Sequence, residues 1–141
     1  MKPVLFLRIA SVLTFVHAVG HTLGGVFGTP PPGAQAAVAV MKANQFQVMG
    51  VMRSYWDFFL GLGLAGSVTM LVEAVVFWQL GSLAKTGTLP LRPVLTAFMV
   101  GYAALAVNSF RYFFAPPMIV EILIASCLGL AILTSKPAAS T

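Results

Sequence analysis

The two histidines of the chain, His17 and His21, lie four residues apart within a long apolar stretch. On an α-helix this spacing places both imidazole rings on one face, roughly 6 Å apart. Imidazole exchanges protons near neutral pH and is also a common metal ligand. Because ionisable groups in hydrocarbon are costly, the pair predicts a functional site with polar partners facing it.

The three acidic residues are Asp57, Glu73 and Glu121, and each falls within an apolar segment. Ionisable residues inside membrane segments are rare and commonly functional. Depths estimated from a helical rise of about 1.5 Å per residue place Asp57 and Glu121 level with the two histidines, in the outer half of a bundle. We therefore expect His17, His21, Asp57 and Glu121 to form a catalytic layer.

Four further side chains are expected at this depth as substrate-binding groups: Arg53, Trp56, Asn108 and Arg111. The arginines could bind an anionic headgroup or stabilise developing negative charge. Ordinary roles also fit, because Trp56 suits an interfacial aromatic belt and Arg111 could extend to the headgroups. Arg53 could pair with Asp57 four residues later, and Asn108 could simply bond between helices.

Glu73 lies deeper than this layer, within predicted reach of Arg8. We expect Arg8 and Glu73 to form a structural ion pair, since each would otherwise be an unpaired charge in a dry environment. The alternative is that Glu73 belongs to a proton path toward the cytoplasmic side, which would need further proton carriers.

The layer favours acid–base chemistry on a lipophilic substrate, with no cofactor. Glu121 or Asp57, paired with either histidine, could protonate a double bond or epoxide and remove a proton elsewhere. One alternative is a non-enzymatic accessory or lipid-binding subunit whose polar layer only holds the helices together. Another is a transition metal at His17 and His21, although the two nearby arginines would oppose a cation. Haem at the same pair is a further alternative, although bis-histidine haem ligands normally lie on facing helices and these two share one helix.

Composition identifies the environment in which these residues act. The 141-residue chain is 59% hydrophobic and 8% charged, with a mean hydropathy of +0.95, whereas soluble domains carry about 25% charged residues. We therefore expect an integral membrane protein. The eight Lys and Arg residues are scattered, without the clustering among aromatics that nucleic-acid binding requires.

The pattern predicts an all-α fold, an up-down-up-down four-helix membrane bundle forming one domain over residues 1–141. Four segments reach the roughly 20 apolar residues that a membrane span needs. They cover about residues 5–25, 54–80, 93–114 and 117–134. The intervening segment, about residues 34–52, is too short and too polar to span, so we expect a short interfacial helix or lid there.

Positive charges near the helix ends predict orientation. One side carries Lys2, Arg8, Lys85, Arg92 and Lys136. The other carries Lys42, Arg53 and Arg111. We therefore expect a bacterial-type cytoplasmic membrane, with both termini in the cytoplasm and residues 34–52 outside. Glycine-rich helix faces could support a homodimer or a partner within a membrane complex.

The layout resembles two families of small membrane proteins, on the evidence of His17, His21, Asp57 and Glu121. Four short helices with polar residues near one membrane face resemble the DoxX-like proteins. Histidine and acidic residues inside a compact bundle are similar to the EXPERA group of sterol isomerases and sterol-binding proteins. This resemblance covers the overall layout and implies a hydrophobic ligand such as a sterol, isoprenoid or quinone.

Overall fold

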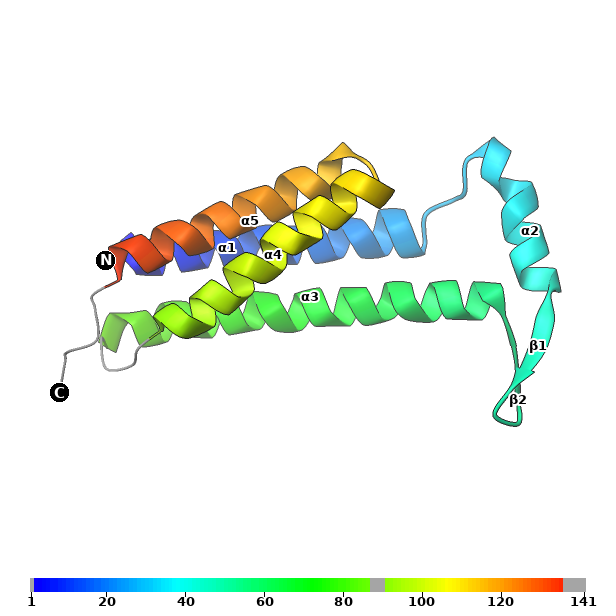
Figure 1. Ribbon diagram of the computed structural model, residues 1–141, viewed down its shortest axis with the longest axis horizontal. Helices are drawn as coiled ribbons and strands as arrows, with labels where there is room; N and C mark the ends of the chain where they lie inside the picture. The colour runs from blue at the N-terminus through cyan, green and yellow to red at the C-terminus, as the bar shows by residue number, and fades with distance from the viewer. Residues whose placement is uncertain (1, 87–90, 136–141) are drawn as a thin grey trace. The chain divides into compact units, whose positions relative to one another are not determined.

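The computed structural model describes residues 2–86 and 91–135, which form five α-helices and one two-stranded sheet (Figure 1). The elements are α1 (Lys2–Gly20), α2 (Gln35–Ala43), β1 (Gln45–Val48), β2 (Val51–Ser54), α3 (Tyr55–Thr86), α4 (Arg92–Tyr112) and α5 (Ala115–Thr134). A π-helical turn, η1 (His21–Val26), directly follows α1. Lys136, which contributed to the predicted orientation, lies outside the described residues.

Four helices are long and apolar enough to cross a membrane: α1 continued by η1, α3, α4 and α5. The prediction of a multi-pass, mainly helical membrane protein is confirmed at this level. Helix α3 has 32 residues, so it is about 48 Å long at 1.5 Å per residue. Since the hydrocarbon core is about 30 Å thick, α3 must tilt or extend beyond the lipid.

The segment after η1 contains the expected short helix, α2, but it also contains a β-hairpin that departs from the predicted all-α class. Strands β1 and β2 pair antiparallel, with Val48 opposite Val51. The two turn residues, Met49 and Gly50, have φ angles of +49° and +86°. Two consecutive positive φ angles are typical of the type I′ turn, whose twist matches that of a hairpin.

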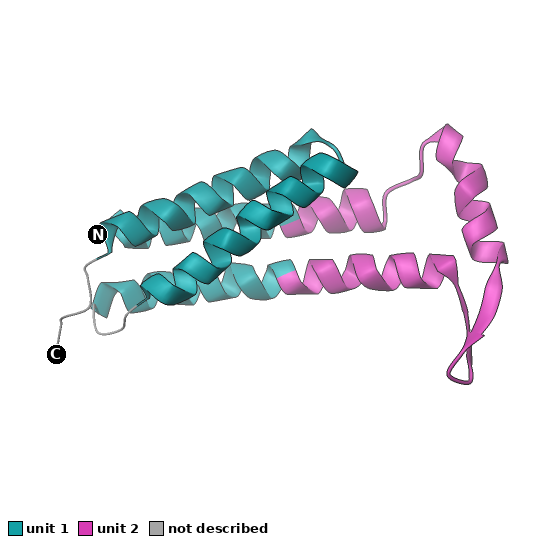
Figure 2. Ribbon diagram, in the orientation of Figure 1, with its two compact units in different colours: residues 1–17, 70–141 teal, residues 18–69 magenta. Residues whose placement is uncertain are grey.

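The chain divides into two compact units, coloured separately in Figure 2. Unit 1 comprises Met1–His17 and Met70–Thr141, and unit 2 comprises Ala18–Thr69. Helices α4 and α5 belong to unit 1, whereas α2 and the hairpin belong to unit 2. Both α1 and α3 contribute residues to each unit.

The core of unit 1 is built from apolar side chains of all four of its helical segments. Its buried members are Leu7, Ala10, Phe77, Leu80, Leu95, Tyr102, Ile124, Leu128 and Ala131. Phe77 is fully buried, and its ring packs edge-on against Phe98 at a centroid distance of 5.0 Å. Helices α4 and α5 form an antiparallel hairpin (Figure 1), in which Met99 lies against Gly129.

Close packing in unit 2 depends on a glycine of α3. A Cβ atom at Gly63 would lie only 2.9 Å from Cγ2 of Val26, the last residue of η1. Because real side chains almost never come so close, the backbone of α3 can approach η1 at this point only where the residue is glycine.

Candidate functional site

Asp57 caps the N-terminus of α3 in unit 2. Its Oδ2 accepts hydrogen bonds from the backbone N–H of Ser54 at 2.7 Å and from the Ser54 hydroxyl at 2.9 Å. In return, the Asp57 N–H donates to Oγ of Ser54 at 3.2 Å. This reciprocal pattern between residues three apart is a capping box. The predicted catalytic residue Asp57 therefore has a structural role, which the Ser-x-x-Asp spacing could have revealed.

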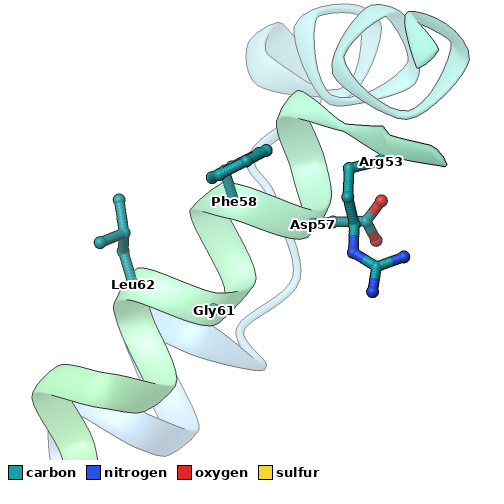
Figure 3. A pocket seen from close by; sticks show the side chains of 5 residues that line it. All are labelled: Arg53, Asp57, Phe58, Gly61 and Leu62. Carbon is teal, nitrogen blue, oxygen red and sulfur yellow. The ribbon is translucent and has the colours of Figure 1, made fainter. Parts of the chain in front are cut away.

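Arg53 lies beside this cap. Figure 3 shows the Arg53 and Asp57 side chains on the same side of the start of α3, with Phe58 and Leu62 pointing away from them. These four residues and Gly61 line a hollow of about 240 Å³. Arg53 is exposed and donates to the carbonyl of Met52 at 2.8 Å. It also attracts the Asp57 carboxylate electrostatically, so the expected i,i+4 interaction is present.

His21 opens η1 and contacts α3 through a small polar cluster, here called the His21 cluster (His21, Thr22 and Ser67). Nδ1 of His21 lies 3.1 Å from Oγ of Ser67, and the Thr22 hydroxyl donates to the same Oγ at 2.8 Å. Ser67 is buried, and the His21 ring lies against Gly66, where a Cβ would be 3.5 Å from Cε1. A π-helical turn carrying such polar contacts is typical of functional sites.

The His21 cluster and the Asp57 cap lie at different levels of α3. Ser67 and Asp57 are ten residues apart, which corresponds to about 15 Å along the helix axis. The predicted pairing of His21 with Asp57 is therefore not formed, because each residue contacts α3 at its own level.

A second hollow in unit 2, of about 380 Å³, is lined by residues from η1, the following loop, α2 and α3. Its lining comprises Val26, Phe27, Gly28, Thr29, Pro30, Val38, Lys42, Trp56 and Leu60. Nζ of Lys42 lies 4.8 Å from the centroid of the Trp56 ring. The volume falls within the range of about 300–1,000 Å³ that is usual for small-molecule sites. Trp56, a predicted binding residue, is part of this hollow, which we call the Lys42 hollow.

In unit 1, polar side chains from three helices form a chain of contacts. The Tyr102 hydroxyl donates to Oε2 of Glu73 at 2.6 Å, and the Thr14 hydroxyl lies 3.4 Å from the Tyr102 hydroxyl. Thr14 and Tyr102 are buried, and Thr14 also donates to the Ala10 carbonyl at 2.9 Å. Glu73 was singled out from the sequence, but Thr14 and Tyr102 were not.

Glu121 is 5% exposed and lies opposite α4 in unit 1. It hydrogen-bonds to Ser109, while its other oxygen, Oε2, is buried with no hydrogen-bond partner among the residues that the structure describes. Tyr102 and Ser109 lie seven residues apart, two turns along one face of α4. Glu121 also interacts electrostatically with Tyr102, so both glutamates face the same polar stripe of α4.

The predicted ion pair between Arg8 and Glu73 is not formed. Nη2 of Arg8 donates to the Ser82 hydroxyl at 2.9 Å, and the guanidinium carbon lies 3.4 Å from the centroid of the Trp78 ring. Trp78 is five residues beyond Glu73, or about 8 Å further along α3. A guanidinium stacked on an indole ring is stabilised without a carboxylate. Glu73 instead accepts a hydrogen bond from Tyr102.

The remaining predicted residues are divided between the two units. His17, Glu121, Asn108 and Arg111 belong to unit 1. His21, Asp57, Arg53 and Trp56 belong to unit 2. Asn108 and Arg111 are exposed on α4, and His17 is half-buried on α1. Among the residues that the structure describes, no three His, Cys, Asp or Glu side chains gather as a metal-ligand set.

Comparison with known proteins gives no family assignment: no family model, curated protein or solved structure matches the chain. The resemblance to the DoxX-like and EXPERA families stays a prediction, and function is argued from the geometry of the two units.

Proposed function

We propose that this multi-pass membrane protein binds an amphipathic lipid with an anionic headgroup in the Lys42 hollow of unit 2. The observation that carries the proposal is a mainly apolar hollow of about 380 Å³ with Lys42 stacked over Trp56 at its edge. Apolar walls suit an acyl or isoprenoid chain, and a few well-placed polar groups orient the ligand.

The charges of unit 2 favour an anion. Lys42 and Arg53 are its two Lys or Arg residues, and Asp57 is its one acid. The Asp57 carboxylate is engaged in capping α3, so it does not neutralise Lys42. Lysine near a membrane surface attracts anionic headgroups, and tryptophan prefers the interfacial level at which those headgroups lie.

Acid–base chemistry on the bound lipid, such as a sterol, isoprenoid or quinone, is a second candidate function. It is favoured by His21, whose Nδ1 is held 3.1 Å from Ser67 at the start of the π-helical turn. A hydrogen bond to one ring nitrogen fixes the tautomer and leaves the other nitrogen available for proton exchange. Asp57 has no part in this version, because it serves as the helix cap.

The orientation that best fits the proposal places both termini in the cytoplasm of a bacterial-type cell, with an up-down-up-down order of the four long helices. The distribution of Lys and Arg residues supports this orientation. It places α2 and the hairpin on the outer side, where Lys42 would meet lipid headgroups. Contacts between glycine-rich helix faces of two copies are a further part of the proposal.

Tryptophan fluorescence can test lipid binding, because the chain has two tryptophans, Trp56 and Trp78. A Trp78→Phe variant in neutral detergent retains Trp56 as its only indole. Titration with anionic lipid that carries brominated chains should quench Trp56 strongly, and zwitterionic lipid should quench it weakly. Adding Lys42→Gln should weaken binding of the anionic lipid about fivefold, since one lysine contributes about 1 kcal/mol.

Lys85→Gln, in the same Trp78→Phe background, is the matched control, because Lys85 is exposed at the end of α3 and belongs to unit 1. It should leave the affinity unchanged. Equal affinities for anionic and zwitterionic lipids, or equal effects of Lys42→Gln and Lys85→Gln, would show that the Lys42 hollow does not select an anionic lipid.

A further inference from the structure

We propose that unit 1 contains a proton-binding site inside its membrane-spanning helices, formed by Glu73, Tyr102 and Glu121. This site is independent of the Lys42 hollow and goes beyond lipid binding. Its ligand is H⁺, held by the carboxyl groups and exchanged through the neighbouring hydroxyls.

The first step is the position of the Tyr102 proton. A tyrosine hydroxyl has one proton, and the Tyr102 hydroxyl donates it in a hydrogen bond of 2.6 Å to Oε2 of Glu73. Bonds of this kind to an ionised oxygen are typically about 2.5–2.7 Å long. The Thr14 hydroxyl lies 3.4 Å from the Tyr102 oxygen, but its own single proton is donated to the Ala10 carbonyl at 2.9 Å. Tyr102 and Glu73 are therefore joined directly by one exchangeable proton, with Thr14 as their polar neighbour on α1.

The second step is the buried oxygen of Glu121. The side chain is 5% exposed, and within residues 2–86 and 91–135 its Oε2 has no hydrogen-bond partner, although the carboxyl is hydrogen-bonded to Ser109. Leaving a charged, buried oxygen unsatisfied costs several times more than leaving a neutral one. A proton on Glu121 removes that charge, so the unpartnered oxygen indicates where the ligand is bound.

The third step is the balance of charge around the two acids. Glu73 on α3 and Glu121 on α5 both face the stripe of α4 that contains Tyr102. The cation expected beside Glu73, Arg8, is bound to Ser82 and Trp78 instead. On α1 the neighbouring groups are Thr14, whose hydroxyl lies 3.4 Å from that of Tyr102, and His17, which is half-buried three residues further along the helix. Glu121 is buried and Glu73 is half-buried. Two ionised carboxylates facing one stripe of a helix repel each other, so we expect at least one of the two carboxyl groups to hold a proton.

The sequence allows a direct test, because Glu73 and Glu121 are the only two glutamates of the chain. Wild-type protein labelled with ¹³C at the glutamate side-chain carboxyl, reconstituted in a zwitterionic bilayer, should give two carboxyl resonances. At pH 7 we expect at least one to have the chemical shift of a protonated acid. The matching infrared C=O band should shift in D₂O. Glu121→Gln or Glu73→Gln, whichever folds, assigns the signals.

Two further variants separate proton binding from simple helix packing. Tyr102→Phe should shift the Glu73 resonance, because Glu73 loses its donor, while Ser126→Ala should leave both unchanged. Ser126 is exposed on α5 and donates to its own helix, at the Ile122 carbonyl. Two ionised glutamates at pH 7 would overturn the proposal. So would a protonated signal that is lost on adding Na⁺ at constant pH, since the site would then bind a cation.

Discussion

At the start of α3, Ser54 and Asp57 satisfy each other's backbone N–H groups. Asp57→Ala removes the acceptor of the Ser54 N–H and hydroxyl but keeps Ser54, the N-cap residue itself. Half of the capping box is lost, so we expect the variant to unfold at a lower temperature in detergent. Its affinity for anionic lipid, measured by Trp56 quenching, should stay the same or rise, since a negative charge near Arg53 is lost.

Arg53→Gln is the companion variant, because Arg53 is the exposed neighbour that attracts Asp57 electrostatically. An exposed ion pair contributes little, so its stability should change by less than about 0.5 kcal/mol. If Asp57→Ala instead kept full stability and lost ligand binding, Asp57 would be a binding or catalytic residue and the capping interpretation would be wrong.

Ser67 holds the His21 cluster together. Ser67→Ala leaves Nδ1 of His21 without its partner, whereas the Thr22 hydroxyl keeps the Ala18 carbonyl, to which it also donates at 2.6 Å. Loss of one such hydrogen bond costs about 0.5–1.5 kcal/mol. We expect reduced thermal stability and a change in the ¹⁵N shifts of the His21 ring as its tautomer is released. Thr69→Val is the control, since Thr69 is exposed and its hydroxyl bonds within α3 to the Ala65 carbonyl. Equal ring shifts in both variants would exclude Ser67 as the group that fixes His21.

The ionisable residues could be found from the sequence, but their partners could not. An acid in an apolar segment stands out by its chemical type, so Glu73 and Glu121 were recognised as site residues. Their partners, Tyr102 and Ser109, are common residues of membrane helices and are distinguished only by facing the right way. That direction depends on how each helix is rotated about its axis, which hydropathy alone does not determine.

At the scale of the helix, two glycines of α3 give opposite predictions. A Cβ at Gly63 would lie 2.9 Å from Val26, whereas a Cβ at Gly61 would meet nothing within 4 Å. We expect Gly63→Ala to destabilise the protein by about 1–3 kcal/mol through overpacking. Gly61→Ala should be neutral or stabilising by up to about 1 kcal/mol, because alanine is the better helix former.

Thermal unfolding of the two variants in the same detergent measures the difference. Similar melting temperatures would mean that η1 does not pack closely against α3 at Val26. Glycine-rich helix faces were expected from the sequence to be contact surfaces, but Gly61 and Gly63 could not be told apart there, because both suit a close helix contact equally well.

The hairpin carries a local strain at its tip. Met49 has a φ of +49°, in the left-handed region that costs most residues about 1–2 kcal/mol. Asparagine tolerates this region, and Asn-Gly is the preferred pair for a type I′ turn. Met49→Asn should therefore stabilise the hairpin by up to about 1 kcal/mol, seen as slower hydrogen exchange at the paired residues Val48 and Val51. Faster exchange would argue against this turn geometry.

The four membrane helices were predictable because a span of about 20 apolar residues is a bulk property of the sequence. The predicted and observed ends of these helices differ by only a few residues, except that α3 continues to Thr86. The hairpin was not predictable, since each strand has only four residues, and alternation over so short a run is a weak signal. The predicted catalytic layer relied on depth alone, and residues at one depth need not meet when they belong to different compact units, as His21 and Glu121 do.

Orientation is the property of the whole molecule on which the proposed lipid site depends. If α1 and α3 both span, Lys2 and Lys85 lie on one side of the membrane and Met49 lies on the other. Met49 is 99% exposed at the hairpin tip, so a cysteine placed there should be accessible to reagents. The native thiol, Cys127, lies within α5 and can be replaced by alanine first.

In this background we expect Met49→Cys to react with a membrane-impermeant maleimide in intact cells. Lys2→Cys and Lys85→Cys should react only after the membrane is permeabilised, because the proposed orientation, based on the excess of positive residues, places the start of α1 and the end of α3 in the cytoplasm. The opposite labelling pattern would agree with four spans but would mean that the orientation in the membrane is reversed, which would place Lys42 at the cytoplasmic leaflet. Labelling of both Met49→Cys and Lys85→Cys from outside would show that α3 does not cross, and the four-span arrangement would be wrong.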